Sequence, residues 1–247
     1  MTGVQTCGLP IYRTCYPFSL PIVKNLKDII FPTQVTFFVG ENGTGKSTIL
    51  EAIALKAGFG PEGGSKNIYF KTSNQNTYEG TELLAQSFVL SWRKKPKDGY
   101  FFRAESFFNI ANYLDTIAKE GGECAYASYG GKSLHEQSHG ESFLSFFKNR
   151  IGRNGLFILD EPEAALSPQR QLSLMIIINE MCKSSNAQFI IASHSPILLA
   201  YPNSTIYSCD SEKLSTIRYT DTKHYQITKR FLNNPEHYMH HMFNPEL

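Results

Sequence analysis

No stretch of this 247-residue chain is apolar for long enough to cross a membrane. The longest apolar runs, such as Leu174–Ile178 and Phe189–Ala192, hold only a few residues, whereas a spanning helix needs about 20. No segment has the pattern of a secretory signal followed by a small-residue cleavage site. These absences predict a protein of the cytoplasm that does not insert into membranes.

Cysteine is scarce, and neither sign of charge dominates. The odd number of cysteines and the lack of any C-x-x-C pair favour reduced thiols at Cys7, Cys15, Cys124, Cys182 and Cys209. The 24 basic and 22 acidic residues leave a net charge of +2, so there is neither a basic nucleic-acid tail nor a disordered acidic segment. The 41% of hydrophobic residues can fill one large core and at most a small lobe.

The amino terminus, Met1–Ile11, reads MTGVQTCGLPI and resembles a translation of a sequencing-adapter oligonucleotide, which gives TGVQTCALPI in one frame. We interpret it as a non-native segment that has overwritten the natural first strand. The alternative is an ordinary, poorly structured terminus. In either case we expect the domain to occupy residues 16–247.

Short apolar runs alternate with helical periods along the rest of the chain. Strands are predicted at Val35–Val39, Lys66–Thr72, Phe88–Trp92, Tyr100–Phe102, Leu156–Leu159, Phe189–Ala192 and Thr205–Ser208. Helices are predicted at Ser47–Ala57, Phe107–Lys119, Ser142–Arg150, Pro168–Lys183 and in the polar tail from Thr222. The alternation predicts an α/β fold with a largely parallel sheet covered on both faces. Residues 59–137 are expected to hold a small inserted lobe.

The segment Gly40–Thr48, GENGTGKST, fits the pattern G-x-x-x-x-G-K-[ST]. It lies between a predicted strand and a predicted helix, where glycines let the backbone wrap a phosphate at a helix N-terminus. Lys46 is predicted to supply positive charge to the β- and γ-phosphates, and the Ser47 hydroxyl to bind Mg²⁺. A glycine-rich surface turn is the plainer alternative, but it does not explain the strand and helix on either side.

Two acids follow the predicted strand Leu156–Leu159. Ligand sites of open α/β sheets lie at the carboxyl ends of strands, so we predict that Asp160 holds Mg²⁺ and that Glu161 orients or deprotonates an attacking water. The alternative is that the acids cap a helix beginning at Pro162. Their position downstream of the phosphate loop favours the chemical role.

A third predicted strand, Phe189–Ala192, runs into Ser193-His194-Ser195-Pro196. His194 is placed to reach a γ-phosphate and sense its presence. A lone histidine at a strand end is more often structural, but its pairing with Asp160 and Glu161 favours a functional role.

The order GENGTGKST, LDEPEAALSP and ASHSP resembles the ABC-type P-loop ATPase superfamily. The resemblance runs from about Tyr16 onward. It is closer to the soluble chromosome-maintenance and recombination-repair ATPases than to transporter subunits, and closest to small bacterial AAA or ATP-binding proteins. It implies hydrolysis of ATP to ADP and phosphate with Mg²⁺. It also implies ATP-driven head-to-tail dimerisation that acts on an unknown protein partner.

The resemblance also assigns roles by motif position. The Walker A loop that binds ATP comprises Asn42, Gly43, Thr44, Gly45, Lys46, Ser47 and Thr48. Lys46 is also catalytic, Asp160 is the Walker B acid and Glu161 the catalytic base. The D-loop corresponds to Ala164–Ser167, and His194 is the switch histidine.

The superfamily signature that touches the nucleotide of the opposite subunit matches Ser138-His139-Gly140-Glu141-Ser142 best. Ser138 and Gly140 fall on the serine and second glycine of the LSGGQ pattern, whereas Glu141 replaces the glutamine. A plain helix cap is the alternative. Glu105 stands where the Q-loop glutamine is expected.

Several alternatives stay open at the level of sequence. One is an ATPase subunit of a transporter, which the departures SHGES and EAALSP disfavour. Another is a DNA-associated repair or defence ATPase, because the basic run Arg93–Lys97 allows a nucleic-acid contact as well as a solvated loop. The adenine is expected to stack on Tyr69, Tyr78 or Trp92. Leu172, Met175, Ile176 and Met181 are expected to form a core stripe.

Overall fold

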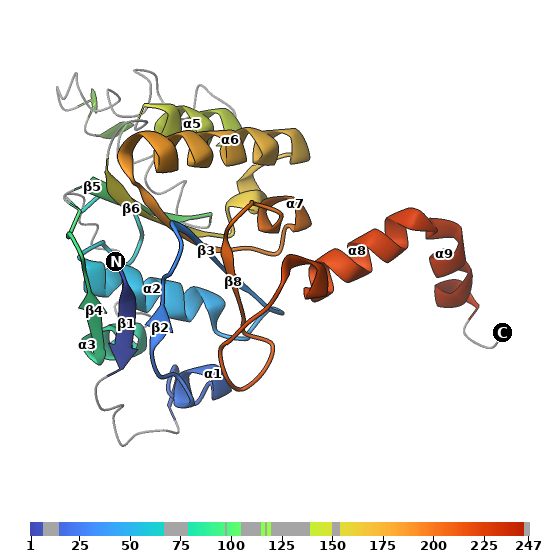
Figure 1. Ribbon diagram of the computed structural model, residues 1–247, viewed down its shortest axis with the longest axis horizontal. Coiled ribbons are helices and arrows are strands. Elements are labelled where there is room, and N and C mark those ends of the chain that lie inside the picture. Colours follow the sequence, from blue (N-terminus) through green and yellow to red (C-terminus); the bar gives the residue numbers. More distant parts are fainter. Residues whose placement is uncertain are drawn as a thin grey trace.

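The computed structural model describes residues 1–6, 15–66, 79–96, 98–104, 115–116, 118–119, 139–149 and 154–244. Within these residues the centre of the molecule is a six-stranded sheet in the order β5-β6-β7-β3-β8-β9 (Figure 1). Its strands are β3 (Val35–Val39), β5 (Asp98–Arg103), β6 (Gly155–Asp160), β7 (Gln188–Ala192), β8 (Thr205–Ser208) and β9 (Ser215–Thr216). All pair in parallel except β9, which is antiparallel to β8. The predicted α/β fold is confirmed.

Both faces of this sheet are buried. Every residue of β3 and β6 is buried, and successive side chains enter opposite cores, so that Phe37 and Phe38 belong to different apolar clusters. A sheet covered on both faces favours continuous apolar runs over alternation. This explains why short apolar runs predicted the strands correctly.

One face is covered by α5 (His139–Lys148) and α6 (Pro168–Ser185), which lie together above the sheet in Figure 1. Aromatic rings fill this layer: the centroid of Phe146 lies 4.1 Å from that of Tyr100, and the centroid of Phe143 lies 4.4 Å from that of Phe102. The helix α5 begins three residues before the predicted start. The predicted helix Phe107–Lys119 lies mostly outside the described residues.

The α6 helix corrects one expectation. Leu174, Ile177 and Met181 face the sheet and are buried, whereas Leu172 and Ile176 are 48% and 60% exposed. The predicted stripe is therefore wrong for Leu172 and Ile176. The helix carries apolar residues on two faces, so its periodicity does not tell which face meets the core.

The other face of the sheet is covered by α2 (Lys46–Ala57), which packs between it and a second sheet of order β2-β1-β4. This antiparallel sheet consists of β1 (Gly3–Thr6), β2 (Ile29–Ile30) and β4 (Phe88–Ser91), with α1 (Pro21–Lys24) and α3 (Glu79–Gln86) nearby (Figure 1). The predicted strand at Phe88–Trp92 is confirmed, but its partner is the amino terminus. The segment Lys66–Thr72 lies outside the described residues except for Lys66.

The amino terminus is part of this second sheet, so the expectation that residues 1–11 stand outside the fold is wrong for residues 1–6. The strand β1 bonds to neighbours on both sides, and Val4 is fully buried. The terminal ammonium of Met1 donates to Gln188, whose Nε2 donates to the Met1 carbonyl at 2.8 Å. Strand pairing uses backbone groups that every residue carries, so an atypical sequence can still take this place. Residues 7–11 lie outside the described part.

We therefore expect deletion of residues 1–6 to destabilise the protein. The change removes the middle strand of the second sheet and the buried Val4 side chain, whose burial alone stabilises by about 1.5–3 kcal/mol. At roughly 2–4 °C per kcal/mol, the melting temperature should fall by at least about 3 °C in calorimetry. The point variant Val4→Asp should do the same, whereas Gln5→Asp, on the exposed side of the same strand, should change little. An unchanged melting temperature after deletion would show that the segment does not pack.

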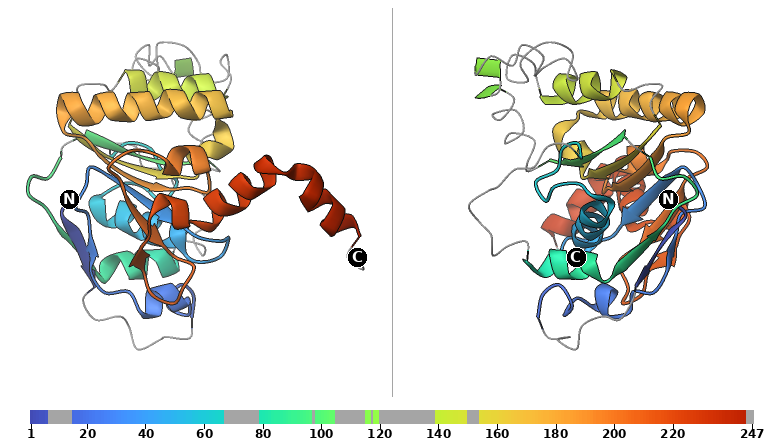
Figure 2. Two further views of the ribbon diagram at one scale, coloured as in Figure 1. Left: turned by 45° about the vertical axis from the view of Figure 1, so that its right-hand side comes forward. Right: turned by 90° about the vertical axis from the view of Figure 1, so that its left-hand side faces the viewer.

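The carboxyl-terminal helices α8 (Lys223–Asn233) and α9 (Pro235–Phe243) form an arm that extends away from the body (Figure 2). No residue of either helix is buried. The arm starts after the short turn Tyr219–Asp221, and the rings of Tyr219 and Tyr225 lie 4.5 Å apart. The predicted polar helices of the tail are confirmed. In the described part of the chain, none of the helices combines the length and the apolar composition that crossing a bilayer requires.

Candidate functional site

The three sequence motifs meet at one edge of the parallel sheet. The strands β3, β7 and β6 are neighbours in that order, so the segments that follow their carboxyl ends lie side by side. These segments are the loop that begins at Gly40, the pair Asp160–Glu161, and Ser193–His194. The structure thus brings together residues that are widely separated in sequence.

The loop after β3 has the conformation that a phosphate cradle needs. Gly43 and Gly45 have φ values of +80° and +95°, which favour glycine. A Cβ atom on Gly45 would lie 2.8 Å from Cγ2 of Ile22, so a side chain would also clash there. The helix α2 begins immediately after Gly45 without a side-chain cap, and a helix N-terminus of this kind attracts anions.

Lys46 lies along this loop and is only 4% exposed. Its Nζ donates to the carbonyl oxygens of Gly40 at 2.7 Å and Glu41 at 2.9 Å. Burial lowers the pKa of Lys46, while nearby acids, chiefly Glu161, act in the opposite direction. The ammonium is held where the loop folds back on itself.

Ser47 and Asp160 lie next to each other, with Ser47 Oγ donating to Oδ1 of Asp160 at 3.0 Å. Asp160 ends β6 and is buried. A hydroxyl and a carboxylate are hard oxygen ligands of the type that Mg²⁺ prefers, commonly together with substrate phosphates. The residues present therefore fit the predicted Mg²⁺ site.

Glu161 has an unusual backbone, with φ +50° and ψ +53°. This left-handed conformation costs a residue with a Cβ roughly 1–2 kcal/mol. The Glu161 N–H donates to the carbonyl of Ala192 in β7 at 3.0 Å, which holds the conformation in place. The side chain is 41% exposed, and its Oε1 lies 3.2 Å from His194 Nε2.

His194 is held from two further sides by residues that the sequence did not single out. Its backbone N–H donates to Oε1 of Glu163, which also accepts from Ser193 Oγ at 2.9 Å. Its ring Nδ1 lies 2.9 Å from Nε2 of His224, at the start of α8. Burial raises the pKa of Glu163, and its hydrogen bonds with the backbone and with Ser193 oppose that rise. In the sequence, Glu163 is marked only as the third acid of the segment Asp160–Glu163, DEPE.

A cavity of about 370 Å³ opens over the phosphate loop, lined by Tyr16, Leu20, Asn42, Gly43, Gly45, Lys46, Ser47, Thr48 and Glu161. Tyr16 is 57% exposed, and its hydroxyl lies 2.9 Å from Thr48 Oγ1. On the other side of the loop, Asp210 Oδ1 accepts the Glu41 N–H at 2.9 Å. No local pattern in the sequence marks Tyr16 or Asp210, because both reach the loop only through the fold.

The structure describes only some of the other predicted site residues. Ser138 and Glu105 lie outside the described residues, as do Tyr69 and Tyr78. His139 and Gly140 begin α5, and Glu141 Oε1 pairs with Arg170 Nη2 of α6 at 3.1 Å. Trp92 packs against the core cluster around α2 rather than lining the cavity.

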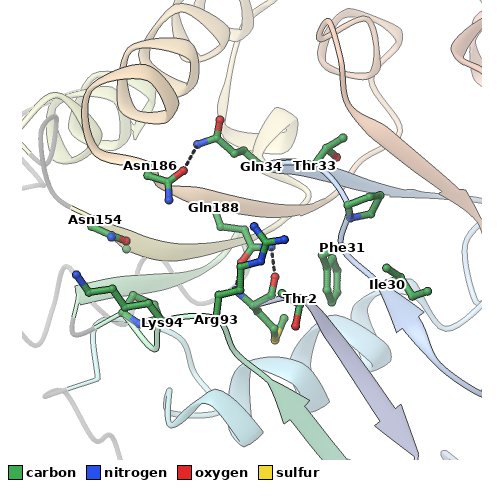
Figure 3. Close-up of a pocket in the computed structure, with 14 residues that line it drawn as sticks. Thr2, Ile30, Phe31, Thr33, Gln34, Arg93, Lys94, Asn154, Asn186 and Gln188 are labelled. Atoms are coloured by element: carbon green, nitrogen blue, oxygen red, sulfur yellow. Dashed lines mark hydrogen bonds between the residues drawn. The ribbon is translucent and has the colours of Figure 1, made fainter.

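A second cavity, of about 390 Å³, lies at the opposite ends of the strands (Figure 3). Its lining includes Gln34 and Gln188, which precede or begin β3 and β7, together with Arg93 and Lys94. Gln34 Nε2 donates to Asn186 Oδ1 there at 3.1 Å. None of the three motifs reaches this cavity, so the candidate site is the one over the phosphate loop.

A family model described as "AAA domain" matches residues 18–157, which is more than half of the chain. The chain belongs to this AAA-domain family. A further model, whose description begins with "AAA domain" and also names a Type IV TA system, matches residues 135–200 of this AAA-domain protein.

Curated relatives are more distant. The protein is 25% identical over 186 residues to the ribose import ATP-binding protein RbsA of Bacillus cereus. The aligned region covers 70% of this chain and 37% of RbsA. It is 24% identical over 237 residues to the tungstate uptake system ATP-binding protein TupC of Campylobacter jejuni, covering 86% of this chain and 69% of TupC. The chain thus spans little more than a third of RbsA. The family match and these relatives place it in the P-loop ATPase superfamily, as the motifs predict.

Solved structures to which the chain is similar include cbiO1 of Clostridium perfringens, part of the ABC transporter complex cbiONQ. It has a TM-score of 0.45 and 19% identity, and the alignment covers 87% of this chain and 91% of that one. The SMC head domain of Thermotoga maritima has a TM-score of 0.42 and 15% identity, with 88% and 98% covered.

Proposed function

We propose that this AAA-domain protein is a cytoplasmic enzyme that hydrolyses ATP to ADP and phosphate at the carboxyl edge of its parallel sheet. The observation that carries the proposal is the convergence of Lys46, Asp160, Glu161 and His194 around one phosphate loop. Ser47 contacts Asp160 at 3.0 Å, and His194 contacts Glu161 at 3.2 Å. Each group has the chemistry that phosphoryl transfer to water requires.

The roles follow from the contacts. Mg²⁺, held by Ser47 and Asp160, would supply positive charge to the phosphates. Lys46 binds the β- and γ-phosphates within the cradle. Tyr16 lines the same cavity, and its exposed ring can stack on the adenine. Glu161 orients the attacking water and accepts its proton. When ATP is bound, the Nε2–H of His194 would donate to the γ-phosphate in place of its contact with Glu161.

The proposal includes a dimer that forms head-to-tail when ATP binds. Its support is the signature-like segment Ser138–Glu141, which a second copy would place over the open cavity above the phosphate loop. Each ATP would then contact both subunits, and loss of the γ-phosphate would release them. The dimer would act on an unknown protein partner.

Light scattering with Mg-ATP tests this dimer. Glu161→Gln should slow hydrolysis, so we expect it to run as a dimer with ATP and as a monomer with ADP. Adding Ser138→Arg should keep the protein monomeric in both, because bulk and charge enter the interface. If Glu161→Gln stays monomeric at saturating ATP, the shared site is wrong for this chain.

A second candidate, the ATPase subunit of an importer, is favoured by the names of the relatives RbsA and TupC. Co-purification with a membrane permease would support it. The support for a DNA-associated role is limited to the basic residues Arg93 and Lys94, which line the cavity at the far end of the sheet. DNA that accelerates ATP turnover would support that role.

A further inference from the structure

The carboxyl-terminal arm reaches the candidate site through its first turn. His224 is the second residue of α8. Its Nε2 lies 2.9 Å from Nδ1 of His194, and the two rings meet edge to face with centroids 4.9 Å apart. Beyond this turn, Tyr225, Thr228 and Leu232 of α8 line a cavity together with residues of α6 and α7, and α9 extends away from the body (Figures 1 and 2). His224 belongs to none of the motifs that define the site.

With both imidazole rings neutral, the two hydrogen bonds define which nitrogens carry protons. An ionised Glu161 only accepts hydrogen bonds, so His194 must donate to it from Nε2. A neutral imidazole that donates from Nε2 accepts at Nδ1. His224 must therefore donate from its own Nε2 to His194. The contacts form one directed chain from the arm through His194 to Glu161.

The environment of His224 supports its neutral form. Its Nδ1 is buried and, among the described residues, has no hydrogen-bond partner, so a proton there would lack an acceptor. Burial lowers the pKa of His224, and the ring of His194 and the ammonium of Lys46 also disfavour a positive charge there, whereas Glu41 and Asp210 act in the opposite direction. A neutral His224 with its proton on Nε2 is the state that the directed chain requires.

We propose that His224 is a positioning residue for ATP hydrolysis. It holds the His194 ring in one orientation and one tautomer, so that Nε2–H always points toward Glu161 and the γ-phosphate. The inference rests on the proposed ATPase function and adds the arm to the catalytic machinery. Histidines with demanding roles commonly have such a partner on the second ring nitrogen, which fixes tautomer and direction.

A second contact ties the same turn to the phosphate loop. Lys223 Nζ lies 3.7 Å from Oδ2 of Asp210, whose Oδ1 accepts the Glu41 N–H. Because Lys223 is 56% exposed, this ion pair contributes little stability by itself. Two successive arm residues nevertheless contact the candidate site: Lys223 reaches Asp210 beside the phosphate loop, and His224 reaches His194 after β7.

His224 is not needed to start the helix. Thr222 caps α8, since its Oγ1 accepts the Tyr225 N–H. Substitutions at His224 should therefore leave the helix in place, and the effect on His194 can be measured separately.

The test compares His224→Leu, which cannot donate, with His224→Gln, whose amide NH₂ can reach the Nδ1 of His194. We expect His224→Leu to lower kcat about 10-fold, as the loss of an outer partner of a histidine does, with KM for ATP changed less than about 2-fold. His224→Gln should recover most of the rate. The control His237→Leu, on the exposed surface of α9, should match the wild type. A wild-type kcat in His224→Leu, or a loss in His224→Gln as large as in His224→Leu, would overturn the proposal.

Nitrogen NMR of the histidine rings separates this inference from the ATPase proposal. In the wild-type protein above pH 7.5, the His194 signals, identified by their loss in His194→Gln, should show a protonated Nε2 and an accepting Nδ1. A proton on Nδ1 of His194 would refute the positioning role even if ATP is hydrolysed. The expected tautomer without any ATP turnover would refute the ATPase proposal and leave the histidine pair intact.

Discussion

Replacing Lys46 with alanine is expected to weaken ATP binding by a factor of about 100 or more, to below detection in ordinary calorimetry. The ammonium is almost fully buried in the phosphate loop, where it would make charge-assisted hydrogen bonds to two phosphates. Each such bond contributes about 1.5–3 kcal/mol, and 1.4 kcal/mol corresponds to a factor of ten in affinity.

The matched control is Lys56→Ala, which removes an exposed lysine from the last turn of the same helix. It should bind ATP as the wild type does. Melting temperatures of both variants establish that the fold is retained. Wild-type affinity in Lys46→Ala would show that the loop is not the phosphate cradle.

Replacing Glu161 with glutamine is expected to lower kcat at least about 100-fold, because a general base contributes 10²–10⁴-fold to the rate. Glutamine keeps the size of the side chain and an oxygen that can accept from His194, so ATP affinity should change less than about 3-fold. The left-handed backbone is equally strained in both proteins. Phosphate release and calorimetry together measure the two effects.

Glu180→Gln is the matched control, since it makes the same chemical change at an exposed position of α6. It should leave both kcat and affinity unchanged. A Glu161→Gln protein that hydrolyses ATP at the rate of this control would remove Glu161 from the role of base.

The sequence predicted the edge of the sheet that holds the candidate site, because that edge depends on local patterns. Apolar runs at Val35–Val39, Leu156–Leu159 and Phe189–Ala192 are each followed by polar motif residues. Parallel neighbouring strands end at one edge, so the meeting of Ser47, Asp160 and His194 could be expected. The proposed chemistry then follows from residue type.

Features that depend on contacts between distant segments were not predictable in this way. His224 and Asp210 reach the site only after the arm and β8 are placed, and neither carries a local signal. The strand β1 was missed because its sequence looked foreign, yet pairing depends on its backbone and on Val4. Leu172 was assigned to the core because periodicity reveals an apolar face without showing what covers it.

The most direct test of the central claim is to identify the nucleotide after incubation with Mg-ATP. Wild-type protein and Glu161→Gln are mixed with ATP, denatured at intervals, and their ADP and phosphate measured by chromatography. We predict equal amounts of ADP and phosphate from the wild type, only when Mg²⁺ is present, and intact ATP from Glu161→Gln. ADP formation at the same rate in both proteins, or none in either, would contradict ATP hydrolysis by Glu161 at this site.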